Sequence, residues 1–170
     1  MTRSPLTDAF AHNAWATLRL MDACSELTPE QLGTAVPGTY GSILDTLRHL
    51  VATDSWYLWV ITEGAHQPFD EEDGLDVPEL RAAAERQREA WSRLLESPID
   101  PDRMIVRRRD DGSETHAPLG VRLAQAVHHG TDHRSHVCTI LTSLGVEPPG
   151  IDVWDYAEAT GRSSEVPPPA

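Results

Sequence analysis

Four of the eight histidines of this chain lie within twelve positions, in the stretch AVHHGTDHRSHV (126–137). If this stretch is helical, residues four apart lie on one face, so His129 and His133 can bind one metal ion together. His136 continues that face, but it follows His129 by seven residues, which is about 10 Å along the helix axis. His128 points about 100° away from His129. The spacing therefore predicts two ligands from this helix, His129 and His133.

A third ligand has to come from another segment. His49 lies among leucines in LDTLRHLVATDSWYL (44–58), a second predicted helix from which it could reach across a bundle. Three imidazoles with an open coordination position are typical of catalytic zinc sites, and imidazole also suits nickel, copper and iron. An interpretation without metal stays open, in which His129 and His133 lie on a solvated helix face and His49 is a hydrogen-bonded core residue.

Several other chemistries lack the residues they need. HGTDH (129–133) has the spacing of the H-E-x-x-H metalloprotease motif, but Gly130 stands where the glutamate base is required. A ferritin-like di-iron site needs paired Glu-x-x-His motifs, and only EGAH (63–66) matches. The chain has no lysine, which excludes Schiff-base chemistry. Cys24 and Cys138 are too few for a disulfide framework, which favours a reducing, cytoplasmic location.

The bulk properties narrow the range of partners. A chain of 170 residues is long enough for one domain with its own core. The net charge of −13 repels phosphate backbones and anionic membranes, so we expect neither nucleic acid nor a membrane as a partner. The N-terminus lacks the apolar run of a signal peptide, and WYLWVI (56–61) is too short to span a bilayer.

Four long helical patterns should position the histidines, at about 5–27, 42–61, 76–97 and 119–144. TPEQL (28–32) predicts a short capped helix, and Asp111-Gly112 predicts the turn of a β-hairpin. A final short helix within 151–160 is expected to pack Trp154 and Tyr156 on the body. Together the patterns predict an all-α four-helix bundle with a small hairpin insertion over residues 1–161, and a disordered tail over 162–170.

Three stretches together resemble the DinB-like family of four-helix-bundle metalloenzymes: HNAWATLRLMDACSELTPEQL (12–32), GSILDTLRHLVATDSWYLWVITEG (41–64) and LAQAVHHGTDHRSHVCTILTSLGVEPPGIDVWDYA (123–157). The resemblance implies a bundle, commonly a homodimer, with a divalent metal bound by His49, His129 and His133. Zinc is the first expectation for this metal, with nickel or iron as alternatives. Family members often read H-R-x-Q where this chain reads HRSH, so His136 takes the place of the glutamine.

The resemblance also implies a class of reaction. Characterised relatives use low-molecular-weight thiols such as mycothiol or bacillithiol in S-transfer or isomerisation. A metal with an open position can deprotonate a bound thiol, and the thiolate is the competent nucleophile. Two alternatives stay open. The protein could be a metal-dependent hydrolase, in which the ion activates water, or a non-catalytic metal-binding stress protein.

Four further residues are candidates for supporting the ligands. Asp45 lies one turn before His49 and could orient its second ring nitrogen. Thr53 lies one turn after His49, Gln125 lies one turn before His129, and His136 follows His133. For each of them, a surface or capping role is the alternative.

Overall fold

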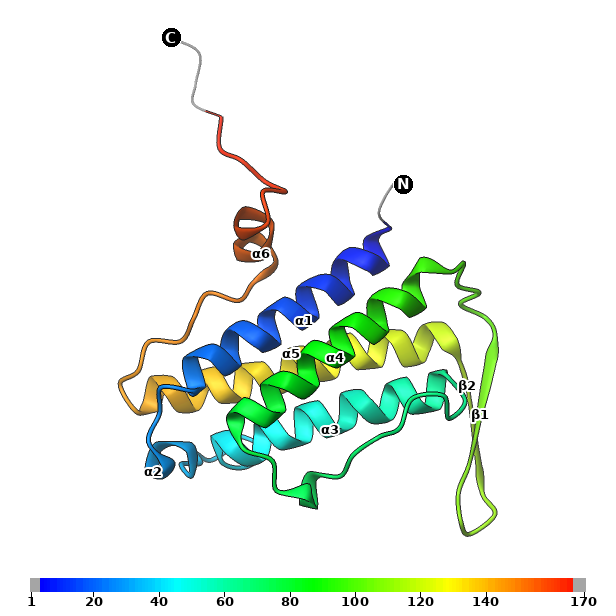
Figure 1. Cartoon of the computed structure of the whole chain (residues 1–170), viewed down its shortest axis with the longest axis horizontal. Helices are drawn as coiled ribbons and strands as arrows, with labels where there is room; N and C mark the ends of the chain where they lie inside the picture. The colour runs from blue at the N-terminus through cyan, green and yellow to red at the C-terminus, as the bar shows by residue number, and fades with distance from the viewer. Residues whose placement is uncertain (1–3, 167–170) are drawn as a thin grey trace.

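The computed structural model describes residues 4–166, and its four long helices form a bundle (Figure 1). These helices are α1 (Pro5–Cys24), α3 (Ile43–Ile61), α4 (Val77–Glu96) and α5 (Leu119–Ser143). Three short helices connect or follow them: α2 (Pro29–Leu32), the 3-10 helix η1 (Glu71–Asp73) and α6 (Val153–Ala159). Strands β1 (Met104–Arg108) and β2 (Glu114–Pro118) form the hairpin that precedes α5. The predicted bundle with a small hairpin insertion is therefore confirmed.

Most helices begin where the sequence supplies a capping side chain, whereas α5 follows Pro118 and has none. At the start of α3, Ser42 Oγ accepts from the backbone N–H of Asp45, and the Asp45 carboxylate accepts from the backbone N–H of Ser42. Thr28 and Gln31 form the same reciprocal pair at the start of α2, as TPEQL predicted. These contacts satisfy backbone N–H groups that have no partner within the helix.

The order of helix packing places α3 beside α5. Each of α1 and α3 packs against both α4 and α5. Along α5, the residues that precede His129 (Leu119, Leu123, Ala126) belong to one apolar cluster, and those that follow His133 (Val137, Ile140, Leu141) belong to the other. Burial of each large aliphatic side chain contributes about 1.5–3 kcal/mol to folding. The histidines thus occupy the part of α5 between two well-packed ends of the core.

The hairpin forms where Asp111-Gly112 predicted it. β1 and β2 pair antiparallel with Met104 opposite Pro118 and Arg108 opposite Glu114. Gly112 has φ +82, which a side chain would strain, so glycine suits this turn.

One packing prediction for the C-terminal segment is wrong. Tyr156 of α6 is buried and makes edge contacts with the rings of His12 and Trp15, but Trp154 is 76% exposed. Residues two apart on a helix point in different directions, so a helix of this length buries only one of the two rings. The expected tail over 162–170 is described as far as 166 and has no regular secondary structure there, while 167–170 lie outside the described residues.

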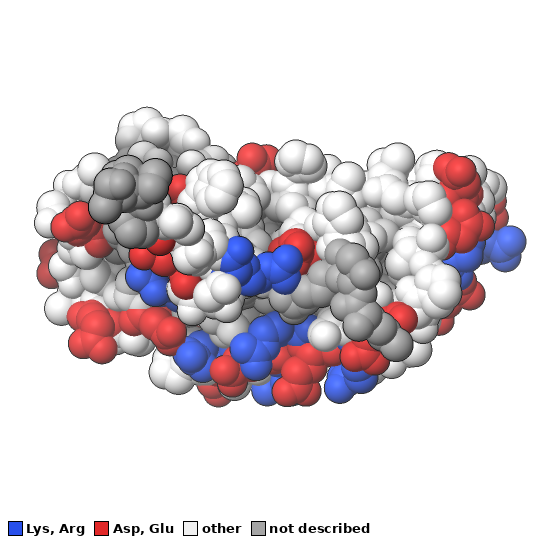
Figure 2. Space-filling view, turned by 90° about the horizontal axis from the view of Figure 1, so that it is seen from above, with Lys and Arg blue, Asp and Glu red and all other residues white. Residues whose placement is uncertain are grey.

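Arginines and acids are interspersed on the face shown in Figure 2. Among the described residues, the Arg81 guanidinium pairs with both Asp22 (2.5 Å) and Glu85 (3.1 Å). Within residues 4–166 no helix is long and apolar enough to cross a bilayer.

Candidate metal centre

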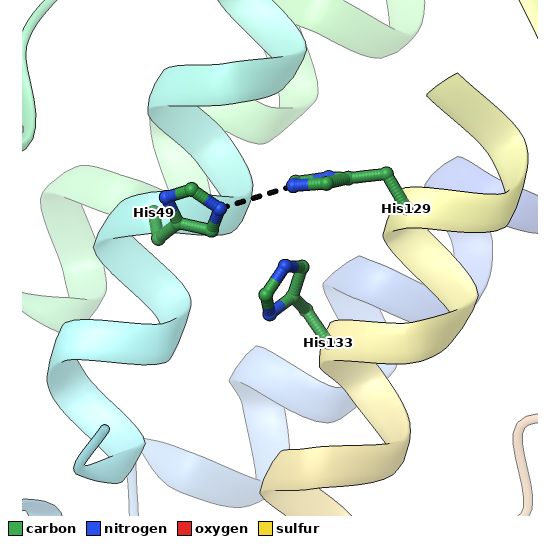
Figure 3. Close-up of side chains that lie close together, drawn as sticks. All are labelled: His49, His129 and His133. Atoms are coloured by element: carbon green, nitrogen blue, oxygen red, sulfur yellow. Dashed lines mark hydrogen bonds between the residues drawn. The ribbon is translucent and has the colours of Figure 1, made fainter. Parts of the chain in front are cut away.

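Three histidines from two helices converge in the middle of the bundle. His49 projects from α3, and His129 and His133 project from neighbouring turns of α5 (Figure 3). The Nε2 atoms of His49 and His129 are 3.0 Å apart. One nitrogen from each of the three rings lies within 4.8 Å of the other two. The structure therefore brings together the three side chains that the sequence singled out.

The surroundings keep two of these rings neutral. Burial, followed by the charge of the neighbouring imidazoles, lowers the pKa of His129 to about 4. The same two causes lower the pKa of His133 to about 4. Only a neutral imidazole offers a lone pair to a cation. At neutral pH, therefore, each of these two rings is uncharged and has one nitrogen with a lone pair.

The donor set fits a divalent transition metal. Nitrogen ligands about 2.0–2.1 Å from a tetrahedral zinc ion lie about 3.4 Å from one another. The observed 3.0 Å separation, and the 4.8 Å limit over all three rings, bracket that value. In addition, Nδ1 of His133 is buried with no hydrogen-bond partner among the described residues. The three side chains would need only small ring movements to hold one ion.

The second nitrogen of His49 is occupied by a residue that the sequence did not suggest. Glu71 of η1 places Oε1 2.6 Å from His49 Nδ1. Tyr40, in the loop before α3, stacks its ring on that of His49 with a centroid separation of 4.0 Å and donates its hydroxyl to Glu71 Oε2. Asp45, a candidate for orienting His49, has the capping role that was the alternative, because it caps α3 through Ser42. Sequence position gave no signal for Glu71, because a loop carries it back to the helix.

The other candidates lie at differing distances from the centre. His136 places its ring edge-on to His133, with centroids 5.3 Å apart. Gln125 is exposed and is a hydrogen-bond partner of Tyr57, whose ring in turn lies edge-on to His129 at 5.9 Å. Thr53 is half-buried one turn beyond His49. His136 is therefore next to the centre, and Gln125 reaches it only through Tyr57.

The structure explains the glycine within HGTDH. A Cβ atom at Gly130 would collide with Asn13 Oδ1 and Arg134 Nη1. Arg134 is buried and donates from Nη1 to Asn13 Oδ1 (2.6 Å) and to Thr17 Oγ1 (3.1 Å), which ties α5 to α1. The position that holds a catalytic glutamate in H-E-x-x-H enzymes is here a close helix–helix contact.

A half-buried carboxyl of α3, that of Asp54, contacts α4. Trp91 of α4 donates its indole N–H to Asp54 Oδ2 at 2.8 Å. Burial raises the pKa of Asp54 to about 6, although the Trp91 hydrogen bond and the charge of Arg134 oppose this change. Asp54 and His129 both line one small cavity, together with Asn13 and Gln87.

Comparisons with known proteins agree on a family and a fold. A model of the DinB family matches residues 1–167. Among solved structures, the chain is similar to YfiT from Bacillus subtilis, described as a probable metal-dependent hydrolase with an unusual four-helix bundle topology. That match has a TM-score of 0.63 and 17% identity, and it covers 86% of this chain and 91% of YfiT. A DinB-like protein from Bacillus cereus ATCC 10987 matches with a TM-score of 0.67 and 14% identity, over 86% of this chain and 95% of that one. No curated protein sequence matches.

Proposed function

The chain belongs to the DinB family, and we propose on this basis that it is a divalent-metal-dependent enzyme whose cation is held by His49, His129 and His133. One observation carries the proposal: three imidazole nitrogens from two helices lie within 4.8 Å of one another. Exposed acidic clusters occur widely without metal, but three convergent histidines on rigid helices are an arrangement built for coordination. Zinc is the proposed metal, with nickel or iron as alternatives.

The chain's own residues would prepare this site before any ion arrives. The bundle fixes the backbone of all three ligands, because α3 and α5 pack side by side. The lowered pKa of His129 and of His133 keeps both rings uncharged at neutral pH, so that they do not repel a cation. His49, His129 and His133 would hold a divalent cation, and the chemistry that such a cation would supply is a lowered pKa of a bound water or thiol.

The proposed reaction is S-transfer or isomerisation that uses a low-molecular-weight thiol such as mycothiol or bacillithiol. In S-transfer, the thiol loses its proton, its sulfur bonds to an electrophilic carbon, and the leaving group departs with the bonding electrons. Thiolate is a soft ligand that suits zinc, and it is a stronger nucleophile than the thiol. The support for this choice is the family resemblance together with a ligand set that leaves a position free.

A second candidate function is metal-dependent hydrolysis of a small molecule. The observation that favours it is the likeness to YfiT, itself described as a probable metal-dependent hydrolase. A metal ion held by the same three histidines could activate water, which would then be the nucleophile. The two functions differ in one requirement, since hydrolysis needs no thiol.

Metal analysis followed by an activity screen tests the proposal. We expect about one zinc, nickel or iron ion per chain, and conjugation of a test electrophile such as a chlorodinitrobenzene only when thiol is added. His129→Ala should abolish both, and His128→Ala, which changes the exposed neighbour on the same helix, should preserve both. Turnover without thiol would favour the hydrolase. Metal that raises the melting temperature without any turnover would indicate a binding protein, and a chain that binds no metal would refute the proposal.

We also propose that the protein is a homodimer, as the family resemblance implies. Light scattering coupled to size-exclusion chromatography should then give twice the chain mass of 18.8 kDa. A mass equal to one chain across the micromolar range would contradict this.

A further inference from the structure

We propose that Glu71 is a positioning residue of the metal centre, whose carboxylate holds the His49 ring in the tautomer that turns a free Nε2 lone pair toward His129 and His133. The inference rests on the proposed function, because it concerns how a metal ligand is oriented. It adds a residue from outside both ligand-bearing helices to the machinery of the site.

The contact itself determines the tautomer. Glu71 Oε1 lies 2.6 Å from His49 Nδ1, and a carboxylate can only accept a hydrogen bond. His49 Nδ1 must therefore carry the proton, which leaves Nε2 as the nitrogen with a lone pair. That Nε2 atom faces His129 Nε2 at 3.0 Å. Metal-binding histidines in general gain orientation and basicity from a carboxylate placed in this way.

The loop around Glu71 is built to present its side chain. Residues Glu71–Asp73 form η1, and Asp70 is its N-cap residue. Asp70 Oδ1 accepts from the backbone N–H of Glu72, and Asp73 Oδ2 accepts from the backbone N–H of Asp70. Gly74, with φ +70, then ends the turn in a conformation that suits glycine. The acidic run DEED is thus a closed turn in which Glu71 is the member that faces the histidines.

Helix α3, which carries His49, also holds both ends of the loop that contains η1. Arg48, the residue before His49, donates from Nε to the Leu75 carbonyl (2.9 Å) and from Nη2 to the Gly74 carbonyl (3.0 Å). On the other side of η1, the backbone N–H of Phe69 donates to Ser55 Oγ at 3.3 Å. Because the anchors and His49 share one helix, the distance from Glu71 to His49 is set within a single rigid unit.

Tyr40 completes the arrangement from a second loop. Its hydroxyl donates to Glu71 Oε2 at 3.2 Å, so both carboxylate oxygens have partners. Its ring stacks on His49 with an interplanar angle of 20° and meets His133 edge-on at 5.2 Å. Glu71 is therefore held in place by a residue that also packs on two of the proposed ligands.

Three variants separate this role from a general effect of charge. Glu71→Gln keeps the shape of the side chain but removes the charge, and its amide can turn an N–H toward Nδ1. Glu72→Gln is the matched control, because Glu72 is exposed on the same turn and uses only its backbone N–H. Tyr40→Phe keeps the stacked ring and removes only the hydroxyl bond to Glu71.

The measurements are zinc affinity by chelator competition, the His49 tautomer by long-range ¹H–¹⁵N correlation spectra of metal-free protein, and the melting temperature of that protein. We expect Glu71→Gln to weaken zinc binding by about 10- to 100-fold and to increase the Nε2–H tautomer. Glu72→Gln should match the wild type, Tyr40→Phe should weaken binding by a smaller factor, and all three should melt close to the wild type.

Two results would overturn the inference while leaving the metal proposal intact. One is wild-type zinc affinity and an unchanged tautomer in Glu71→Gln, and the other is an equal loss of affinity in Glu72→Gln. If Glu71→Gln does not fold, wild-type affinity in Tyr40→Phe counts against the inference. A wild-type protein that binds no zinc, nickel or iron refutes the proposed function, which is a distinct result.

Discussion

His49 and His129 approach each other through their Nε2 atoms at 3.0 Å, although 80 positions separate them in the sequence. Two neutral rings can share such a contact only if one Nε2 donates a proton and the other accepts it. Because Glu71 accepts from His49 Nδ1, His129 is the donor. A cation bound between the rings would take the place of that proton, so binding of a metal and the choice of tautomer are linked at this one contact.

The first prediction concerns the ligand from α3. His49→Ala should lower zinc affinity by 100-fold or more. The variant loses a metal ligand and, with it, the hydrogen bond from Nδ1 that orients this ligand. His116→Ala is a suitable control, since His116 lies on the hairpin and contacts Glu114 instead. Competition with a chelator measures both variants, and equal affinity in the two would exclude His49 as a ligand.

The second prediction concerns close packing at Gly130. Gly130→Ala should lower the free energy of unfolding by about 1–3 kcal/mol, because the added methyl group collides with Asn13 and Arg134. The higher helix propensity of alanine offsets only about 1 kcal/mol of this cost. Ser135→Ala, at an exposed position of α5, should be neutral or slightly stabilising. Urea denaturation provides the comparison, and a stabilised Gly130→Ala would contradict the packing described above.

The third prediction concerns acid sensitivity without metal. His129 and His133 have a pKa of about 4 in the fold, against an ordinary value of 6.5. The unfolded chain therefore binds more protons between these values, and stability that is full above pH 6.5 is lost as the pH falls toward 4. The metal-free wild type should show this loss in thermal melts, and a His129→Gln/His133→Gln double variant should show less. Parallel pH profiles would refute the prediction.

The fourth prediction concerns Asp54, whose contribution to stability falls as the pH rises. The pKa of Asp54 is raised from 3.8 to about 6, so the folded protein binds the extra proton and loses stability as the pH rises from about 4 to 6. Asp54→Asn removes this term and still offers an oxygen to the Trp91 indole. Relative to that of the wild type, the free energy of unfolding of the variant should rise by about 3 kcal/mol between pH 4 and pH 8. A constant or falling difference would mean that attraction to Arg134 outweighs burial.

The sequence by itself determined those features that depend on local periodicity and on capping and turn residues. The pairing of His129 with His133 follows from the helical repeat, and capping pairs such as Thr28 with Gln31 marked where helices begin. The bundle followed from four long apolar patterns, and the hairpin followed from Asp111-Gly112. His49 could be named as a candidate because a mid-helix histidine beside a core stripe can reach across a bundle, although a hydrogen-bonded core role was the alternative. Its metal-binding role remains a proposal.

Only the tertiary structure decided which groups surround those histidines. Glu71 lies 22 positions from His49 and reaches it by a loop, and no repeat relates the two positions. The helical repeat made Asp45 a candidate for orienting His49, but Asp45 takes part in the cap of α3. The reason for Gly130 is likewise a contact with α1 that is distant in sequence. Periodicity specifies which face of a helix a residue occupies, but the partner opposite that face depends on how the loops bring the chain back.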